Sequence, residues 1–439
     1  MSYALDIIKQ SIQDIRLNHS KKRRRYVEKL LNYYTGTDTD QYIHKYFDAK
    51  SYQEVPLYTI NFTKKFIDKK SRIYTLAPSR KVGSKTFTKK YDKLVKDKNI
   101  RMKHVERMTN LLGVCALYVY WQQEEDSGYI DYRPIYYFDA FFGEDPYNPI
   151  AICYPMLNPT SDTSYSHLDQ VKYCYWDNTY KIVYDSNGNV LEETRHGLGV
   201  IPFVFPRNME QIDDFYGEGA SDISGTNEQV NITLTELQLG LRFQMFGQPW
   251  ASGVYDDEPI TRMGSDTIIN LPADGRFGIE SPQGDIAKVI ESIKFQLELL
   301  ARSKHMNITF DSNQDRPSSG LALIIKDFDR IEDYQDTVEQ WRLFEHSLYK
   351  LEKVIAKANG IEFPKEIIVE FEEPEYPKSV GERIQLWNWM LERGHTTDAE
   401  ILKNNKKDIS IEEAQAIIDK NIEENPQEEE EDQNNFNAK

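Results

Sequence analysis

The segment DRPSSGLALIIKDFD, residues 315–329, joins two different kinds of sequence. Its first half is polar and contains Pro317 and Gly320, which interrupt regular structure. Its second half begins an apolar stripe with helical spacing that continues without Pro or Gly as far as Gly360. A helix of that length would span roughly 55–60 Å, well above the usual helix length. The sequence therefore predicts a polar loop, residues 307–320, that leads into one very long helix.

Two amphipathic segments precede this loop and flank a stretch rich in Gly and Pro. The first predicted helix covers residues 223–249, and the second covers 286–306, where apolar residues recur four and three positions apart. Between them, residues 250–285 contain short β-prone pieces such as DTIINL. We therefore expect a helix, a small β-containing insert and a second helix.

The residues before 223 have the pattern of an α+β body. Helical spacing over 4–34, 59–75 and 87–111 gives way to strand-like GVCALYVYWQQ at 113–123. Further strands are expected up to residue 206, including a hairpin whose turn is Asn187-Gly188. The basic run KKRRR at 21–25 is compatible with a solvated helix face or with contact to nucleic acid or a partner, and the solvated face is the simpler interpretation.

The residues after Gly360 contain three further patterns. KEIIVEFEEP, beginning at residue 365, is strand-like, and residues 379–422 form a smaller amphipathic unit. The last residues, EENPQEEEEDQNNFNAK, are acidic and typical of a disordered tail.

Charge and cysteine usage narrow the functional classes. Lys and Arg total 54 against 71 Asp and Glu, so the net charge is −17. That balance argues against a protein that grips nucleic acid by neutralising phosphates, while a protein that lets nucleic acid pass is compatible with it. Cys115, Cys153 and Cys174 stand far apart without a CxxC pair, as expected in a reducing cytoplasm. No apolar run is long enough to predict a membrane span or a signal peptide.

No catalytic or metal-binding motif emerges from the sequence. RKVGSKT at 80–86 lacks the upstream glycine and the Gly-Lys pair of a phosphate-binding loop. DSNQD at 311–315 has Arg316 where a calcium loop needs Gly. GEGAS at 217–221 fits a helix start better than a nucleophile elbow, and His196 is expected to be structural. The sequence therefore predicts no enzyme activity, no cofactor and no metal.

The order of these parts resembles the portal proteins of tailed bacteriophages, the family that includes the portal of phage SPP1. Three stretches carry the resemblance: LLGVCALYVYWQQEEDSGYIDYRPIYYFDAFFGED, RHGLGVIPFVFPRN and SSGLALIIKDFDRIE. They look like the family's Gly-strand-strand block, its His-Gly-Ile-Pro-strand segment before the stem and its entry to the long wing helix. The resemblance covers residues from about 55 to about 420. The short region after the long helix and the polyacidic end depart from better-known members.

The resemblance implies an α+β portal fold with named parts. Residues 1–222 would form the wing, 223–249 and 286–306 the two stem helices, and 250–285 the clip. Residues 307–320 would be the tunnel loop, and 321–372 the long wing helix with a return strand. Residues 373–439 would be a short crown with the acidic tail.

The resemblance also implies a function and a set of site residues. Twelve copies would form a ring at one capsid vertex, assembled in the host cytoplasm, through which double-stranded DNA is packaged and ejected. The partners would be the terminase, the scaffold, the major capsid protein and the head-completion or tail adaptor proteins, with no membrane. The tunnel loop would present Asp311, Asn313, Gln314, Asp315, Arg316, Ser318 and Ser319 to DNA. Lys288, Lys294 and Lys304 would be candidates for the channel wall, and Ile290, Ile293 and Leu297 would face neighbouring stem helices.

Two other classes remain as alternatives. Another virion head structural or adaptor protein would share the partners but not the ring conduit. A DNA-packaging enzyme such as a terminase would need an ATP-binding loop or a metal-binding acidic cluster, and the sequence shows neither convincingly.

Overall fold

The long helix predicted from the apolar stripe is α11, Phe328–Ala358, and the core of the main unit forms around it. The computed structural model describes residues 6–9, 19–47, 57–124, 127–156, 171–208, 215–246, 248–252, 274–280, 284–306, 328–372, 380–405 and 410–424. The chain is a mixed α+β protein with several small antiparallel sheets. It divides into two units. The main unit is Met1–Phe310 with Asp329–Glu373, and the second unit is Asp311–Phe328 with Pro374–Lys439.

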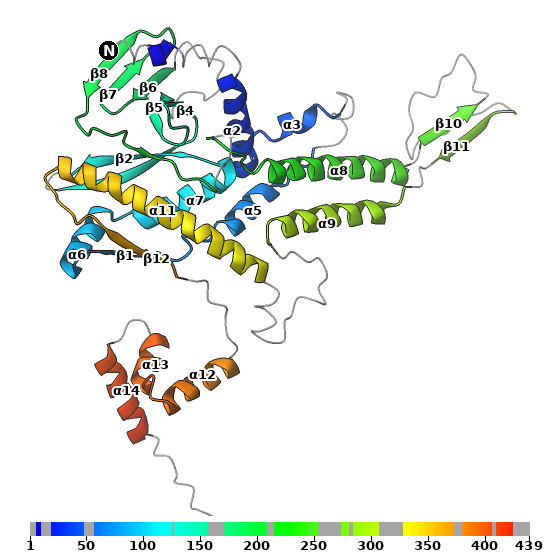
Figure 1. The fold of residues 1–439 in the computed structure, drawn as a ribbon. Helices are drawn as coiled ribbons and strands as arrows, with labels where there is room; N and C mark the ends of the chain where they lie inside the picture. The colour runs from blue at the N-terminus through cyan, green and yellow to red at the C-terminus, as the bar shows by residue number, and fades with distance from the viewer. Residues whose placement is uncertain are drawn as a thin grey trace, which may run out of the picture. The chain divides into compact units, whose positions relative to one another are not determined.

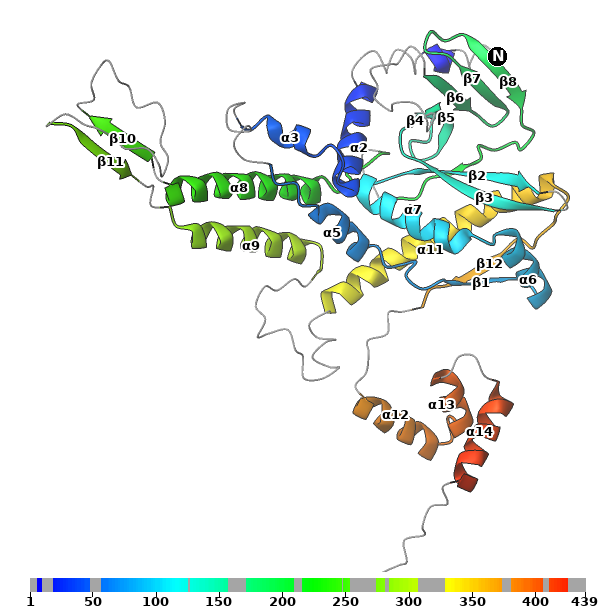
Figure 2. The same cartoon turned by 180° about the vertical axis from the view of Figure 1, so that it is seen from behind.

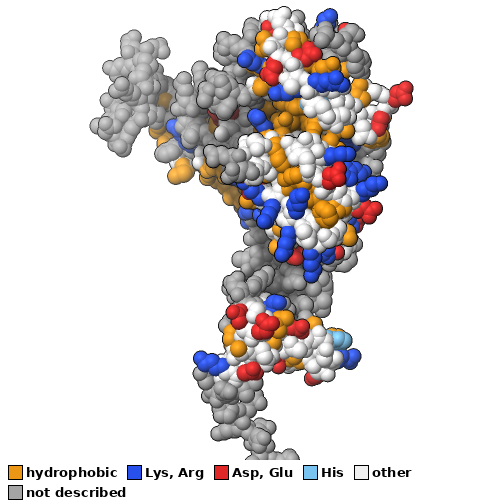
Figure 3. All heavy atoms as spheres, turned by 90° about the vertical axis from the view of Figure 1, so that its left-hand side faces the viewer, with side chains coloured by type: hydrophobic (Ala, Val, Ile, Leu, Met, Phe, Trp, Pro, Cys, Tyr) orange, Lys and Arg blue, Asp and Glu red, His pale blue; other side chains and the backbone are white. Residues whose placement is uncertain are grey.

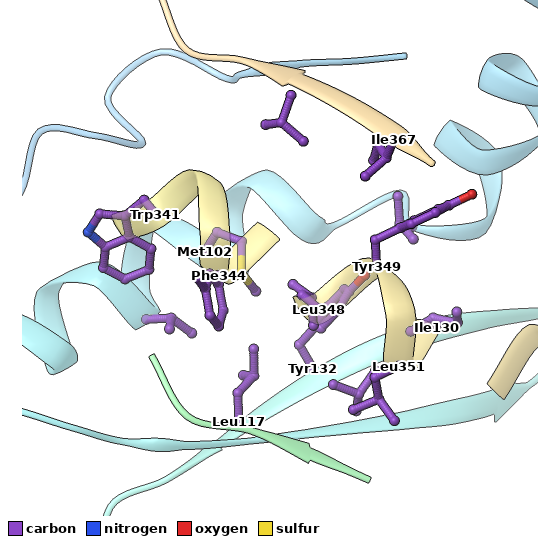
Figure 4. Close-up of a cluster of buried hydrophobic side chains, with 14 of the residues drawn as sticks. Met102, Leu117, Ile130, Tyr132, Trp341, Phe344, Leu348, Tyr349, Leu351 and Ile367 are labelled. Atoms are coloured by element: carbon purple, nitrogen blue, oxygen red, sulfur yellow. The ribbon is translucent and has the colours of Figure 1, made fainter. Parts of the chain in front are cut away.

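The inner face of α11 packs between two sheets. On one side lies a three-stranded sheet of order β3-β2-β9, formed by Gly128–Ile135, Ala116–Gln123 and Phe203–Val204. On the other side β1, Ser79–Val82, pairs antiparallel with β12, Ile367–Glu370. Figure 4 shows Phe344 and Leu348 between Leu117 of β2 and Ile367 of β12. The strands predicted at 113–123 and after residue 365 are thus confirmed.

A five-stranded antiparallel meander forms a third sheet of the body. Its strands, in spatial order, are β4 Asp139–Phe142, β5 Pro149–Met156, β6 Lys172–Trp176, β7 Tyr180–Tyr184 and β8 Val190–Arg195. The predicted Asn-Gly hairpin joins β7 to β8. Asp185 Oδ1 accepts hydrogen bonds from the backbone N–H groups of Asn187 and Asn189, and Gly188 adopts φ 88°. Left-handed backbone of this kind favours glycine, so the turn residues set the register.

The helices of the body differ in extent from the sequence prediction. They are α2 His19–Thr35, α3 Asp40–His44, α5 Phe62–Lys70, α6 Lys85–Leu94 and α7 Lys98–Leu112. The predicted helix over 87–111 is two helices, because Val95 leaves helical geometry at φ −114° and ψ 37°. RKVGSKT is strand β1, a turn at Gly83 and the cap Ser84, whose hydroxyl accepts a bond from the N–H of Phe87.

The basic run at 21–25 is not simply a solvated helix face. Arg24 is buried and donates to Asp139 Oδ2 at 2.8 Å, and Arg23 donates to the other carboxylate oxygen of Asp139. The Arg23 guanidinium also lies 4.0 Å from the ring centroid of Tyr216. These two arginines tie α2 to β4, so the solvated interpretation was wrong for them because their partner lies more than a hundred residues away.

The second unit contains three helices in the part that the structure describes: α12 Val380–Glu392, α13 Asp398–Asn405 and α14 Ile411–Glu424. Two of them begin with reciprocal caps. Thr397 and Glu400 exchange side-chain and backbone hydrogen bonds, and so do Ser410 and Glu413. The predicted amphipathic unit at 379–422 is confirmed as helical, and the acidic tail lies outside the described residues. None of the helices described is long and apolar enough to cross a membrane.

Candidate functional site

A helical hairpin with a small β ribbon is the part of the main unit most distinct from its body. It consists of α8 Ser221–Phe246, β10 Gln248–Ser252, β11 Arg276–Glu280 and α9 Ile286–Ser303. Figures 1 and 2 show α8 and α9 side by side, with β10 and β11 beyond their ends. The strands are antiparallel, and Gln248 pairs with Glu280. This arrangement confirms the predicted helix, β insert and helix.

A row of polar side chains on α8 fixes the hairpin to the body. Asn227 Oδ1 accepts hydrogen bonds from the N–H groups of Phe62 and Thr63, and its amide donates to Ile60 O at 3.0 Å. Asn231 accepts from Ile60 N at 3.1 Å and donates to Ile60 O. One helical turn later, Thr235 Oγ1 accepts from Tyr58 N at 3.1 Å. α8 therefore satisfies the backbone of residues 58–63 in place of a neighbouring strand.

A buried carboxylate on the same helix adds an electrostatic tie. Glu228 Oε2 lies 2.5 Å from Lys29 Nζ, and Glu228 Oε1 lies 3.5 Å from Lys45 Nζ. Tyr33 also donates its hydroxyl to Glu228. Burial disfavours the charged carboxylate, but the hydrogen bond and charge of Lys29, the charge of Lys45 and the Tyr33 hydrogen bond together outweigh burial, so the Glu228 pKa is lowered.

The end of α9 is anchored in the body as well. Leu300, Ala301 and Met306 are buried in a cluster that includes Ile223 of α8. Lys304 Nζ lies 2.6 Å from the carboxylate of Asp222, so an ion pair joins the roots of the two helices. Both arms of the hairpin are therefore held where they leave the body.

The two helices pack through one apolar seam. Ile293 and Leu297 of α9 are 8% and 7% exposed and contact Val230 of α8, with Leu234 and Val289 beside them. We expected these two residues to face neighbouring subunits. The structure instead buries them within the chain, because the 3.6-residue period that predicts an apolar stripe does not say which partner covers it.

A second apolar strip lies on the outer side of α9. Phe295 and Leu299 are 64% and 58% exposed, and Ile290 and Met245 are exposed too. Phe295 and Leu299 stand one helical turn apart, about 120–160° around the helix from the buried seam. Sequence reasoning missed them because it followed only the main stripe, although an apolar pair with i, i+4 spacing off that stripe was a usable signal. We call Phe295 and Leu299 the outer strip.

The predicted channel lysines occupy different environments. Lys288 is exposed and pairs at 3.1 Å with Asp285, the residue that caps the start of α9. Lys294 is exposed on α9, whereas Lys304 is engaged by Asp222 at the root. The predicted tunnel-loop residues lie outside the described residues: Asp311, Asn313, Gln314, Asp315, Arg316, Ser318 and Ser319.

The described residues contain no group of His, Cys, Asp and Glu arranged to hold a metal ion. His196 closes a loop: its Nδ1 accepts from the N–H of Leu198 at 3.2 Å, and its Nε2 donates to Asp177 O at 2.9 Å. Both ring nitrogens are therefore engaged by backbone groups of this loop. All three cysteines are buried, and burial raises the pKa of Cys115 to about 12, which disfavours a reactive thiolate.

Comparison with known proteins returned no matching family model and no matching curated protein.

Proposed function

We propose that this chain is a portal protein of a tailed bacteriophage, twelve copies of which form the DNA conduit at one capsid vertex. The observation that carries the proposal is α9, which has two apolar sides. Ile293 and Leu297 use one side within the chain, and the outer strip of Phe295 and Leu299 leaves the other side uncovered. Exposed apolar area on a helix with an already filled core favours contact with another molecule.

A second copy of the chain is the partner that the ring supplies. A ring of identical subunits repeats one heterologous interface around a closed axis, so the outer strip of one copy meets a different surface of the next. The two anchored roots support this role, because the hydrogen bonds of Asn227 and Asn231 and the Asp222–Lys304 pair hold the hairpin in a fixed direction. A pre-oriented helix loses less conformational entropy when it associates.

The remaining parts acquire roles within this proposal. The β10–β11 insert is the clip on which the terminase and later the head-completion or tail proteins dock, and scaffold and capsid protein surround the wing. Residues 307–320 form the tunnel loop. One Arg316 beside Asp311 and Asp315 binds phosphate weakly, which suits DNA that slides. A conduit performs no covalent step and needs no cofactor.

The test is the native mass of the purified chain, with negative-stain images of the same fraction. We expect particles with a central channel and a mass near twelve times that of one chain. If only monomers form, the measurement is repeated after co-expression with scaffold and capsid proteins of the same phage. Absence of rings under both conditions would overturn the proposal and favour another head structural protein.

A further inference from the structure

One short helix of the body, remote from the hairpin in sequence, has an unusual concentration of lysine. α6, KTFTKKYDKL, contains Lys85, Lys89, Lys90 and Lys93, all exposed, and Asp92 is its single acidic residue. None of these four lysines forms an ion pair with an acidic residue in the part of the chain that the structure describes. Two lysines next to the helix differ, since Lys81 pairs with Glu370 and Lys96 with Glu124.

Three of the four lysines form a straight row. Lys85, Lys89 and Lys93 recur every four residues, so they share one face of α6 and rise about 6 Å from one to the next. The opposite face is buried through Tyr91 and Leu94. The row is therefore presented outward.

The buried face gives the row a rigid base. The Tyr91 hydroxyl donates to Glu352 of α11 at 2.6 Å, and the Tyr91 ring packs edge-on against Tyr349 and Phe363. Lys90 Nζ lies 5.9 Å from the centre of the Phe363 ring. α6 is thus fixed to the end of α11 and to the segment that follows it.

Further lysines lie on α11 and on the segment after it, the two parts of the chain that contact Tyr91 of α6. Lys357 and Lys365 are exposed and Lys353 is partly exposed, again without an ion pair to any described acidic residue. Figure 3 shows the face on this side of the molecule, where Lys and Arg side chains gather over the lower part of the main unit. We call Lys85, Lys89, Lys90, Lys93, Lys353, Lys357 and Lys365 the lysine face.

The lysine spacing is mostly unfavourable for α6 itself, although Lys93 in the last turn suits the helix dipole and Lys90 contacts Phe363. Like charges four residues apart destabilise a helix, and Lys85 in the first turn opposes the helix dipole. The chain as a whole has a net charge of −17, so the lysine face departs from the general composition. A cluster of like charges that forms no ion pair with any described acidic residue favours contact with an anionic partner.

We propose that the lysine face binds the phosphate backbone of double-stranded nucleic acid without reading its sequence. The choice of lysine distinguishes this partner from an acidic protein. Protein interfaces are enriched in Arg and depleted in Lys, whereas Lys binds phosphate as a point charge. α6 has no Arg. The face is separate from the hairpin and does not require a ring, so it goes beyond the proposed function.

The experiment measures binding of the full chain to a short fluorescent duplex of random sequence while salt rises from about 50 to 200 mM. The test variant is K85Q/K89Q/K93Q. The matched control is K9Q/K22Q/K172Q, which removes the same charge from three other exposed lysines. Each lost phosphate contact lowers the slope of log K against log salt by about 0.9 in magnitude. We therefore expect the test variant to lose close to three units of slope and to bind at least about tenfold more weakly at 0.1 M salt.

Three outcomes would overturn the proposal. One is an unchanged slope in the test variant, and another is an equal loss in the control. The third is tighter binding of labelled poly-glutamate than of the duplex through the same lysines, which would identify an acidic protein as the partner. Thermal unfolding of both variants, together with their native mass, separates loss of binding from loss of fold or assembly. A failure here leaves the ring proposal untouched.

Discussion

A carboxylate oxygen of Glu345 on α11 lies 2.6 Å from a guanidinium nitrogen of Arg80 on β1, and both side chains are buried. Lys98, the first residue of α7, places its Nζ 2.9 Å from Glu345 and 2.8 Å from Glu352. Two positive and two negative groups therefore meet inside the core with no net charge. The network joins α11 to β1 and α7, two elements that lie far earlier in the chain.

Tyrosine hydroxyls complete the network. Tyr74 donates to Glu345 at 2.9 Å, while Tyr91 and Tyr132 donate to Glu352. Burial would raise the Glu345 pKa, but the charges of Lys98 and Arg80 outweigh burial and lower it to about 2. A buried ion cluster is costly to form, and its effect is greatest when one member is removed.

We expect E345Q to destabilise the main unit by about 3–5 kcal/mol, because it leaves Arg80 and Lys98 with unbalanced buried charge. E370Q is the matched control, since Lys81 and Glu370 form an exposed pair and its loss costs about 1 kcal/mol or less. Urea unfolding followed by tyrosine and tryptophan fluorescence measures both variants. Equal effects of the two substitutions would show that the buried network does not stabilise the core.

The raised pKa of Glu106 should make the stability of the fold depend on pH. Its carboxylate accepts hydrogen bonds from the N–H groups of Ile73 and Tyr74, and burial, opposed by these bonds, raises its pKa from 4.5 to about 7. In the unfolded chain Glu106 loses its proton near pH 4.5, whereas in the folded chain it keeps the proton until about pH 7. This residue therefore makes the free energy of unfolding fall as pH rises through that window, on the order of 3 kcal/mol in total.

The check compares the wild type with E106Q between pH 4.5 and 7. We expect the variant to be less stable at low pH, because it loses one hydrogen-bond acceptor, and to show a flatter slope over the window. The contribution of Glu345 does not interfere, since its lowered pKa confines its effect to about pH 2–4.5. Parallel slopes in the two proteins would contradict the assignment to Glu106.

Asn227 makes a prediction about the root of the hairpin. N227A leaves two backbone N–H groups and the Ile60 carbonyl with fewer partners, so we expect a loss of about 2–4 kcal/mol and faster hydrogen exchange in residues 58–63. T233A on the same helix is the control, because the Thr233 hydroxyl donates only to Gln229 O within α8. Exchange in residues 58–63 that is equally slow in both variants would refute the role of Asn227.

The periodicity of apolar residues predicted those helices and strands whose buried face is visible in their own sequence. The hairpin helices, the long helix, the β7–β8 turn and the strand at Ile367 all follow from local spacing. The buried hydrogen bonds and ion pairs do not follow from local spacing, because the two partners lie far apart in the sequence. Glu345 and Glu352 look like exposed positions of α11 until Lys98 and Arg80 are placed beside them.

At the candidate site, too, the sequence predicted the local elements but not their partners. The pattern predicted a hairpin but misassigned Ile293 and Leu297, since a stripe that fits a neighbour also fits the other arm of the hairpin. Asn227, Asn231 and Thr235 stand at four-residue spacing, but this spacing does not reveal that they hold residues 58–63, which lie more than 160 residues earlier in the chain.

The outer strip gives the last prediction, which separates assembly from folding. F295S/L299S removes apolar side chains that the chain leaves exposed, so we expect the free energy of unfolding of the monomer to change by less than about 1 kcal/mol. Because the ring interface would lose its apolar contacts in every subunit, we expect the native mass to shift from ring to monomer. I293A is the opposite control: it opens the buried seam against Val230 and should cost about 2–4 kcal/mol. Sedimentation measures the native mass, and urea unfolding measures the stability, of the wild type, F295S/L299S and I293A. Rings that persist in F295S/L299S would mean that α9 does not contact its neighbour through the outer strip.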